Sequence, residues 1–520
     1  MTYSKIISGD LPELINEIIQ YFRNDFPTLY SCILVNRLWC RIAIPLLWEN
    51  PFSIPTKNYH FIKIYLHNIN EHDKAKLNGY GIINDDIFPS NTLFNYPSFI
   101  KYLNTWKIYR SIITWTSLIT TARTCYYSLS LSFISKTLFK IFIENKANLH
   151  TFEVIASMYF DYLNGAFELI LQNPNFIRGI KNLKLQITYS SKFDSLLSFL
   201  SLNCNSISTF YVQFNRLNSL NETFSSHIIN SQQNLKTILF KYNHFPLHHS
   251  LLSLKNSNCS NTLKTIIFCR INFKNIIILN EVIEHLNVLE SIHLLYCHSL
   301  NSDFIQQIIN TTKQFKLKSL FMDVMLQIDS LRLLLRKSGD YLENIGLVRN
   351  EFEKPLLELI ISYCVKIKYL ELQGYNQSIH LAFDLIKNIG QNLNYLTIDF
   401  DNSILLQGLG QILPSKLEYL NLNLMIIAND FEIFLKNFQN TFVKKLLINN
   451  KMGQDISSYI EDNIIKRQRV KYLAFKDHDT DLFFLDDQVD KFKIYNVIIQ
   501  CYEDLKIDGE KYVEEMGEIY

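Results

Sequence analysis

The sequence has little of several features that would point to particular functions. Its 51 Lys and Arg residues nearly balance 49 Asp and Glu residues, and a net charge of +2 gives no field strong enough to favour nucleic acid or an anionic membrane. The nine cysteines form no CxxC pair and are irregularly spaced, which argues against a disulfide framework or a zinc site. No apolar run approaches ~18 uninterrupted residues, and residues 1–10 lack the apolar core of a signal peptide. We therefore expect a soluble, reduced protein of the cytoplasm or nucleus, with no nucleic-acid or membrane partner.

Local signatures of catalysis and of ligand binding are missing too. The sequence contains neither GxxxxGK nor GxGxxG, the glycine patterns that cradle phosphates. Asp477, Asp479 and Asp481 are spaced like the start of a calcium loop, but Leu482 and Gln488 stand where that loop needs Gly and Glu. No local signature of a nucleophile with its base is present. We expect a protein that is not an enzyme and needs no cofactor or metal.

Apolar residues are abundant, and they recur with a fixed period. Hydrophobic residues make up 48% of the 520-residue chain, which is enough for a large core. The pattern apolar-x-x-apolar-x-apolar occurs thirteen times, at intervals of 24 to 31 residues. Its first positions are 149, 180, 207, 235, 263, 289, 317, 342, 367, 393, 417, 443 and 470. A further strand-like segment lies near 489–499.

The sequence between these copies is typical of helices. In one example, Phe383, Ile386 and Ile389 share a helical face, and Gly390 follows as a stop. Gly339 has the same offset from the next copy, so we expect a left-handed helix end at both glycines. Each repeat therefore reads as strand, turn, helix and turn.

This pattern resembles the leucine-rich repeat superfamily, in the form with units of ~26 residues. The resemblance implies a curved parallel sheet inside and helices outside. The ninth position of that repeat is usually Asn or Cys, whose side chain ties down the turn after the strand. It is filled here by Asn215, Asn243, Cys297 and Asn350, and by other residues elsewhere.

Strand alternation predicts which side chains face the concave side of such a sheet. Repeat positions 1, 4 and 6 point into the core, and positions 3, 5 and 7 point to the concave face. The candidate substrate-binding residues on that face are Tyr211, Leu239, Ile267, His293, Phe321, Tyr369, Tyr395, Tyr419 and Tyr472. The tyrosines fit either cross-strand aromatic pairing or partner binding. The apolar side chains fit either lateral packing or recognition, because on a wet surface they need cover.

Residues 11–48 form a separate apolar pattern. Leu11, Leu14, Ile15, Ile18, Ile19 and Phe22 follow the stripe of one amphipathic helix, with Pro12 in its first turn. A second helix is expected after Pro27, with Val35, Leu38, Trp39 and Ile42 on one face, and a third short segment from Ile44 to Trp48. About 40 residues cannot bury a full core alone, so this segment either packs on the rest of the chain or awaits a partner.

The pattern resembles the F-box, the module that docks substrate receptors onto the Skp1-type adaptor of cullin–RING ubiquitin ligases. The resemblance rests on Leu-Pro at 11–12, the Ile pair at 18–19, Val-Asn-Arg-Leu-Trp at 35–39 and Leu-Trp at 47–48. Departures are Pro27-Thr28, where the family often has an acidic residue, and Asn36, where it often has Cys or Ser. The adaptor-binding residues that the resemblance implies are Leu11, Pro12, Leu14, Ile15, Ile18, Ile19, Val35, Trp39, Leu47 and Trp48.

The expected fold is thus α/β, with all-α F-box helices followed by a leucine-rich-repeat solenoid. We expect an F-box at 8–52, a connector and helical cap at 53–148, about 13 to 14 repeats at 149–500, and an acidic tail at 501–520 that is exposed or partly disordered. Within the connector we expect a loop at 67–79 and helices near 98–119 and 131–146. The resemblance implies the substrate-recognition subunit of a Skp1–cullin–F-box E3 ubiquitin ligase, which binds the adaptor and through it cullin–RING, and holds an unknown protein substrate on the concave face. The alternative is an interaction scaffold that assembles no ligase.

Overall fold

A computed structural model gives the arrangement of most of the chain. It describes residues 12–23, 25–54, 59–67, 69–82, 92–119, 127–156, 160–187, 194–214, 219–241, 247–322, 327–347, 353–374, 379–438 and 442–516. The chain divides into two compact units. Unit 1 comprises residues 1–236 and 244–259, and unit 2 comprises residues 237–243 and 260–520.

Unit 1 begins with three short helices, α2 (Pro12–Tyr21), α3 (Phe26–Ile33) and α4 (Arg37–Leu47), which we call the helical trio. The Asp25 side chain accepts a hydrogen bond from the backbone N–H of Thr28 at 3.2 Å and so caps α3. Asn36 caps α4 in the same way, accepting from the N–H groups of Leu38 and Trp39 at 2.9 and 3.0 Å. Asn36 therefore does the capping work that a Ser would do at this position.

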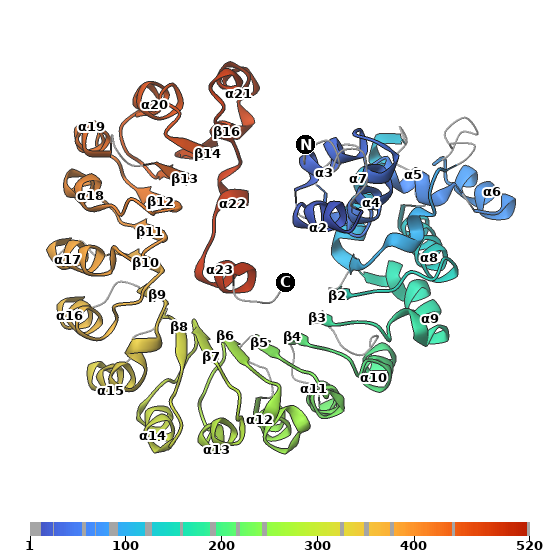
Figure 1. Cartoon of the computed structure of the whole chain (residues 1–520), viewed down its shortest axis with the longest axis horizontal. Coiled ribbons are helices and arrows are strands. Elements are labelled where there is room, and N and C mark those ends of the chain that lie inside the picture. Colours follow the sequence, from blue (N-terminus) through green and yellow to red (C-terminus); the bar gives the residue numbers. More distant parts are fainter. Residues whose placement is uncertain are drawn as a thin grey trace. The chain divides into compact units, whose positions relative to one another are not determined.

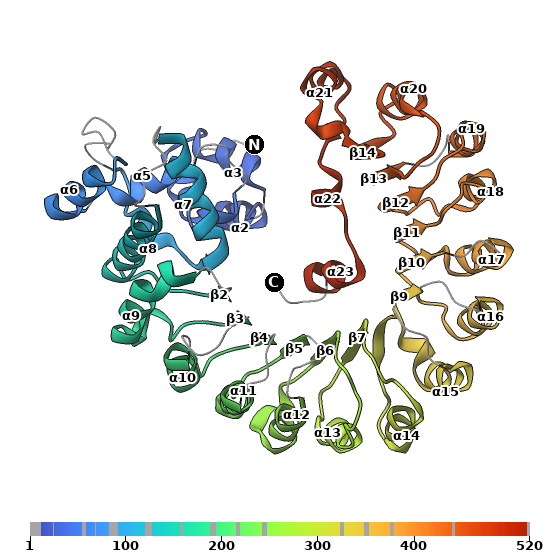
Figure 2. The same ribbon diagram turned by 180° about the vertical axis from the view of Figure 1, so that it is seen from behind.

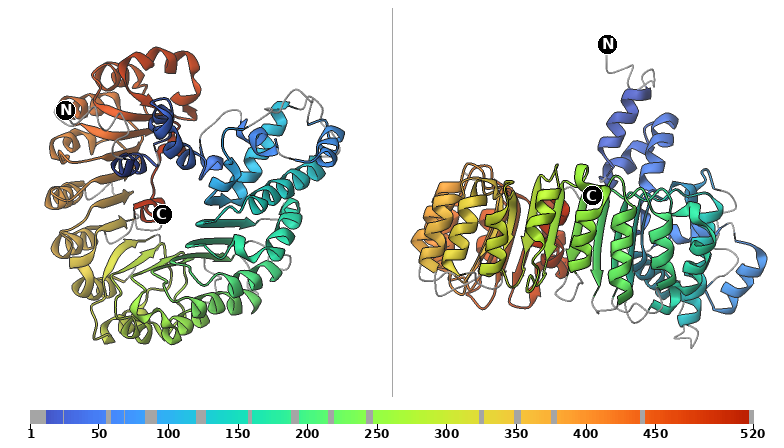
Figure 3. Two further views of the ribbon diagram at one scale, coloured as in Figure 1. Left: turned by 45° about the vertical axis from the view of Figure 1, so that its right-hand side comes forward. Right: turned by 90° about the horizontal axis from the view of Figure 1, so that it is seen from below.

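The trio has a small core of its own, made by one face of each helix. Its buried residues are Ile15, Ile19, Leu29, Cys32, Ala43 and Leu46. The expected helix bounds were wrong in two respects. Val35 lies in the turn between α3 and α4 rather than on a helical face, and the segment from Ile44 continues α4 instead of forming a separate piece. Figure 3 shows α2 and α3 projecting away from the strands of unit 1.

The rest of unit 1 alternates helices with parallel strands. Its helices are α5 (Phe61–Leu66), α6 (Glu71–Gly79), α7 (Thr105–Ile119), α8 (Tyr127–Glu144), α9 (Asn164–Gln172), α10 (Asp194–Asn203), α11 (Ser219–Ser231) and α12 (Leu247–Asn256). Its strands are β1 (Tyr102–Asn104), β2 (Thr151–Ala156), β3 (Asn182–Ile187) and β4 (Thr209–Phe214), paired in chain order. The helices expected near 98–119 and 131–146 are confirmed as α7 and α8. The loop expected at 67–79 was wrong, because Asn70 accepts a hydrogen bond from the Asp73 N–H at 2.8 Å and starts α6 there.

Unit 2 is built mainly from alternating strands and helices. Its parallel strands are β5 (Thr237–Lys241), β6 (Thr265–Cys269), β7 (Ser291–Leu295), β8 (Leu317–Phe321), β9 (Asn344–Leu347), β10 (Tyr369–Gln373), β11 (Tyr395–Asp399), β12 (Tyr419–Leu424), β13 (Val443–Asn450) and β14 (Val470–Asp477). Between them lie α13 (Leu279–His285), α14 (Ser302–Asn310), α15 (Ile328–Ser338), α16 (Glu353–Tyr363), α17 (Ile379–Ile389), α18 (Leu406–Ile412), α19 (Ala428–Asn437) and α20 (Ser457–Ile460). In Figures 1 and 2 these helices line one side of the unit 2 strands. The opposite side of the strands is the concave face.

The thirteen predicted repeats coincide with thirteen strands, β2 to β14. In β10, for example, Leu370 and Leu372 at positions 4 and 6 are fully buried, as the pattern requires. Corresponding positions pair across the sheet, so Tyr369 is aligned with Tyr395, and Tyr395 with Tyr419. A solenoid-like α/β repeat fold is therefore confirmed.

Two predictions about the turns had different outcomes. The Cys297 thiol lies 3.3 Å from the Phe268 carbonyl oxygen, so this side chain does tie down its turn. Asn215, Asn243 and Asn350 lie outside the described residues. The left-handed helix ends expected at Gly339 and Gly390 were wrong, because neither has a positive φ. A side chain at Gly339 would instead press on the Tyr363 backbone, so close packing accounts for that glycine.

The end of the chain also belongs to unit 2. After β14 come β15 (Thr480–Asp481), α21 (Asp486–Phe492), β16 (Ile498–Ile499), α22 (Tyr502–Leu505) and α23 (Gly509–Met516). β15 pairs antiparallel and β16 parallel with β14. Figures 1 and 2 show α22 and α23 on the strand side of unit 2, opposite the helices. The expectation of an exposed or disordered tail was thus wrong for residues 501–516, and residues 517–520 lie outside the described part.

Candidate partner-binding surfaces

The helical trio exposes an unusual amount of apolar surface for so small a module. Leu14 is 40% exposed, Tyr21 88%, Tyr30 61%, Leu34 73% and Val35 48%. These side chains stand on α2, on α3 and in the turn that joins α3 to α4. Several exposed apolar side chains on one small module commonly mark an interaction surface. The trio therefore carries a candidate docking face.

The residues predicted to bind an adaptor are distributed over three environments. Pro12, Leu14 and Val35 are exposed, and Ile18, Trp39 and Leu47 are half-buried. Ile15 and Ile19 lie in the core of the trio and hold its helices together. Leu11 lies outside the described residues. The Trp39 indole N–H has no hydrogen-bond acceptor among the described residues, and such a group usually finds one when it is buried.

Trp48, another residue predicted to bind an adaptor, is half-buried and packs on aromatic rings of its own chain. Its ring lies 5.4 Å from the Tyr65 ring, edge to face, and 4.2 Å from the Tyr96 ring. Both partners belong to the connector that follows the trio. Trp48 therefore packs inward, against the next part of unit 1.

Glu49 completes this junction, and sequence reasoning missed it. Its carboxylate is buried and pairs with the Arg23 side chain at 2.8 Å and with the Lys101 amine at 3.2 Å. The Glu49 carbonyl also accepts hydrogen bonds from the N–H groups of Lys101 and Tyr102 at 3.0 and 3.1 Å. The same residue thus ties α2, the end of α4 and strand β1 together.

The concave face of unit 2 is not open to water where the candidates lie. Seven of the predicted substrate-binding residues in unit 2 are at most 8% exposed: Leu239, Ile267, His293, Phe321, Tyr369, Tyr395 and Tyr419. Of the two alternatives that the sequence left open, burial by the chain itself favours packing within the protein over apolar side chains that await a partner. Tyr472, on β14, is half-buried.

The cross-strand interpretation of the tyrosines is confirmed. The rings of Tyr369 and Tyr395 are stacked with centroids 6.3 Å apart, and those of Tyr395 and Tyr419 are 5.6 Å apart. Pairs of this kind stabilise neighbouring strands. A further ring covers them, because Tyr512 of α23 lies 4.6 Å from Tyr369 and 4.8 Å from Tyr395.

Tyr512 belongs to the C-terminal segment (residues 501–516), which lies along the concave face of unit 2. The Tyr369 hydroxyl donates to the Ile507 carbonyl at 3.0 Å, and the Ile507 N–H donates to the Tyr419 hydroxyl oxygen at 3.0 Å. The Tyr502 hydroxyl donates to the Asn421 side-chain oxygen at 2.8 Å. The tyrosines of the concave face therefore hold the segment through their hydroxyls as well as their rings.

The other end of the segment is held by charge and shape. The Glu510 carboxylate pairs with the Lys241 amine and lies 3.9 Å from the Arg270 side chain. The Cys269 thiol donates to the same carboxylate at 3.4 Å. A methyl group at Gly509 would collide with the Phe321 ring, so only glycine fits there without a shift.

Asp481 also serves this segment. Its carboxylate accepts hydrogen bonds from the Tyr502 N–H at 2.8 Å and from the Phe483 N–H at 3.0 Å. The aspartates that resembled a calcium loop thus include one residue with a structural role. No group of three or more His, Cys, Asp or Glu side chains in the described part of the chain is placed to hold a metal ion.

Burial shifts the ionisation of two groups on the concave face of unit 2. Burial, and to a smaller extent the nearby Lys318 charge, lowers the pKa of His293 to about 3, and its Nδ1 lies 2.7 Å from the Ser319 hydroxyl. Burial raises the pKa of the Glu371 carboxyl, and Asp508 of the segment adds to that rise. His293 is therefore neutral at physiological pH and acts as a buried hydrogen-bonding residue.

Tyr211, the candidate in unit 1, is also covered. Its side chain is 2% exposed, and its hydroxyl donates to the Gln213 side chain at 3.1 Å. The Lys184 amine lies 4.2 Å from the centre of its ring. Tyr211 therefore belongs to the packed surface of its sheet.

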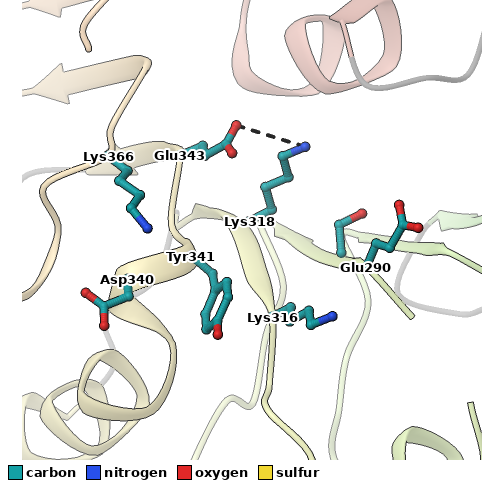
Figure 4. A pocket seen from close by; sticks show the side chains of 8 residues that line it. Glu290, Lys316, Lys318, Asp340, Tyr341, Glu343 and Lys366 are labelled. Atoms are coloured by element: carbon teal, nitrogen blue, oxygen red, sulfur yellow. Dashed lines mark ion pairs between the residues drawn. The ribbon is translucent and has the colours of Figure 1, made fainter. Parts of the chain in front are cut away.

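Unit 2 has a small pocket of about 200 Å³ at the beginning of strands β7 to β10. Figure 4 shows the side chains that line it, which are Glu290, Ser291, Lys316, Lys318, Asp340, Tyr341, Glu343 and Lys366. Lys318 approaches Glu343 at 4.0 Å. Because the three lysines are balanced by three carboxylates, the pocket offers no surplus of charge to hold an ion.

No protein-family model matches the sequence, and no curated protein is similar to it. Within the described residues, no helix combines the length and the apolarity that a bilayer crossing requires. The described residues define a strand–helix repeat array that follows a small helical module.

Proposed function

We propose that this protein is the substrate-recognition subunit of a ubiquitin ligase of the Skp1–cullin–F-box type. The helical trio binds a Skp1-like adaptor, and the repeat array, of the leucine-rich type, holds a protein substrate. The ligase chemistry belongs to other subunits, and the role of this chain is proximity, which raises the effective concentration of a substrate lysine near the charged conjugating enzyme.

One observation carries the proposal. Leu14, Leu34 and Val35 are exposed on a module whose own core is already complete. An apolar face that its own chain does not bury is stabilised when a partner covers it. The F-box-like spacing of the same segment supports an adaptor as that partner.

The test is capture of purified Skp1-type adaptor and cullin by the full-length chain. Val35→Asp should weaken adaptor binding by about a hundredfold, because burial of the exposed half of one valine contributes about 0.8 kcal/mol and an unpaired carboxylate in the interface costs about 2 kcal/mol. Val365→Asp is the matched control, because Val365 in unit 2 is 46% exposed and Val35 is 48% exposed. This control should bind like the wild type.

The pattern of capture separates the candidate functions. Adaptor together with cullin supports the ligase receptor. Adaptor without cullin supports the interaction scaffold instead. Failure to bind either protein, or equal loss of binding in both valine variants, contradicts the proposed docking face.

A further inference from the structure

The C-terminal segment contacts the concave face in the manner of a bound peptide. It carries six carboxylates and two lysines, and it ends the described chain. Its backbone is held by the hydroxyls of Tyr369 and Tyr419, and its Glu510 by the cations of Lys241 and Arg270. Side-chain pockets and backbone hydrogen bonds of this kind are how proteins recognise peptides.

We propose that the concave face of unit 2 is a docking groove for an acidic, tyrosine-containing peptide of a partner protein, and that the C-terminal segment occupies this groove until such a peptide displaces it. The inference deepens the proposed function and rests on it, because it names the class of substrate segment that the repeats would present.

The groove specifies its ligand through three neighbouring subsites. The Phe321 ring leaves room only for glycine, which is Gly509 in the segment. Lys241 and Arg270 receive the carboxylate of the next residue, Glu510. Two positions further on, an aromatic ring packs on the stacked tyrosines. The expected ligand therefore contains Gly, an acidic residue, any residue and an aromatic residue in that order.

The C-terminal segment leaves some buried polar groups of the groove without a partner in the segment. Exchange of the segment for another peptide would therefore lose no contact at these groups. The Asn344 side-chain oxygen is buried on β9 without a hydrogen-bond partner among the described residues. Glu371 is 7% exposed. Its carboxylate accepts a hydrogen bond from the Gln373 side chain at 2.7 Å and forms no ion pair within the described residues. Asp508 of the segment brings a second acidic group toward it. Buried groups that lack compensation weaken an interface, so a better-matched peptide can compete.

The experiment uses the full-length chain and a fluorescent synthetic peptide with the sequence of residues 501–516. The double change Glu510→Lys with Tyr512→Ala removes two subsite contacts and should free the groove. We expect this variant to bind the peptide saturably at one peptide per chain, at least about tenfold more tightly than the wild type, whose groove is occupied. Glu503→Lys is the matched control, because it makes the same charge change at an exposed position of the segment. It should behave like the wild type.

Two further measurements fix the interpretation. Trypsin should cut after Lys506 and Lys511 faster in the double variant, and a peptide that carries the same two changes should not bind it. If the double variant loses hydrogen-exchange protection in β9 to β12, the milder Glu510→Gln takes its place.

Three results would overturn the inference. One is loss of hydrogen-exchange protection in β9 to β12 in both the double variant and the Glu510→Gln variant, because the segment is then a permanent part of the core. The second is a folded, freed variant that does not bind the peptide. The third is equal peptide binding by wild type and variant. Adaptor capture depends on the helical trio, so its outcome is scored separately and distinguishes failure of this inference from failure of the proposed function.

Discussion

Acid should weaken unit 2 at strand β7 because of one buried histidine. His293 is 3% exposed, and burial lowers its pKa to about 3 in the folded chain. In the unfolded chain its pKa is about 6.5. Because the folded state resists protonation, the stabilising contribution is complete above pH 6.5 and is lost as the pH falls toward 3. Between pH 7 and pH 5 the loss is about 2 kcal/mol, at 1.36 kcal/mol per pH unit below 6.5.

The measurement is the free energy of local opening of β7 and β8, from hydrogen exchange corrected for the intrinsic rate at each pH. Tryptophan fluorescence would not serve, because all four tryptophans lie in unit 1. Gln at position 293 can still bond the Ser319 hydroxyl and does not titrate. The stability difference between wild type and His293→Gln should therefore shrink by about 2 kcal/mol from pH 7 to pH 5. Replacement of the exposed His285 by Gln is the control. A pH-independent difference for His293→Gln would refute the reasoning.

Other contacts give predictions of their own. Gly509→Ala should weaken the binding of the C-terminal segment by about 1–3 kcal/mol, because the added methyl group would collide with the Phe321 ring. Trypsin should then cleave the segment faster. Gly79→Ala is the control, because Gly79 has open space around it, and it should leave that cleavage rate unchanged. Asn450→Ala should lower the free energy of local opening of β12 and β13 by about 2–3 kcal/mol, because it removes the acceptor of the Ile426 and Gly453 N–H groups. Unchanged hydrogen-exchange protection of these strands would contradict this prediction. Glu49→Ala should lower the unfolding free energy of unit 1 by about 1–2 kcal/mol, because both of its cationic partners are half-exposed. Tryptophan fluorescence in urea would measure it, and an unchanged midpoint would argue against this junction.

The strands were predictable from sequence because their signal is local. Leu370 and Leu372 alternate with their neighbours inside one strand, and the same alternation returns about 26 residues later. Burial of those side chains decides the register without help from distant parts. The repeat fold could therefore be read directly, whereas β1, which is only three residues long, gave no comparable pattern.

The environment of the concave face could not be predicted, because it depends on distant residues. Tyr419 and Ile507 are 88 positions apart, and Tyr369 and Ile507 are 138 apart. The acidic composition of the tail pointed to disorder. The apolar residues Leu505, Ile507 and Tyr512 indicated burial instead. Their spacing does not follow the repeat pattern, so it did not show where they would pack.

The helical trio shows a similar limit at short range. The apolar stripe of α2 correctly predicted a helix, but adjacent positions on it have opposite environments. Ile15 is buried in the core of the trio while Leu14 is 40% exposed. A helix with apolar residues around much of its surface does not reveal which of them faces inward until its neighbours are placed.

The C-terminal segment also affects how cooperatively unit 2 unfolds. Repeats in a linear array touch only their neighbours, so terminal repeats can open one at a time. Lys241 on β5 and Glu510 are 269 residues apart in sequence, and the same segment reaches β10 and β12. This brace joins early and late repeats directly, so opening either end must first break contacts with the other. Unit 2 should consequently melt in fewer, steeper steps than an unbraced array of the same length.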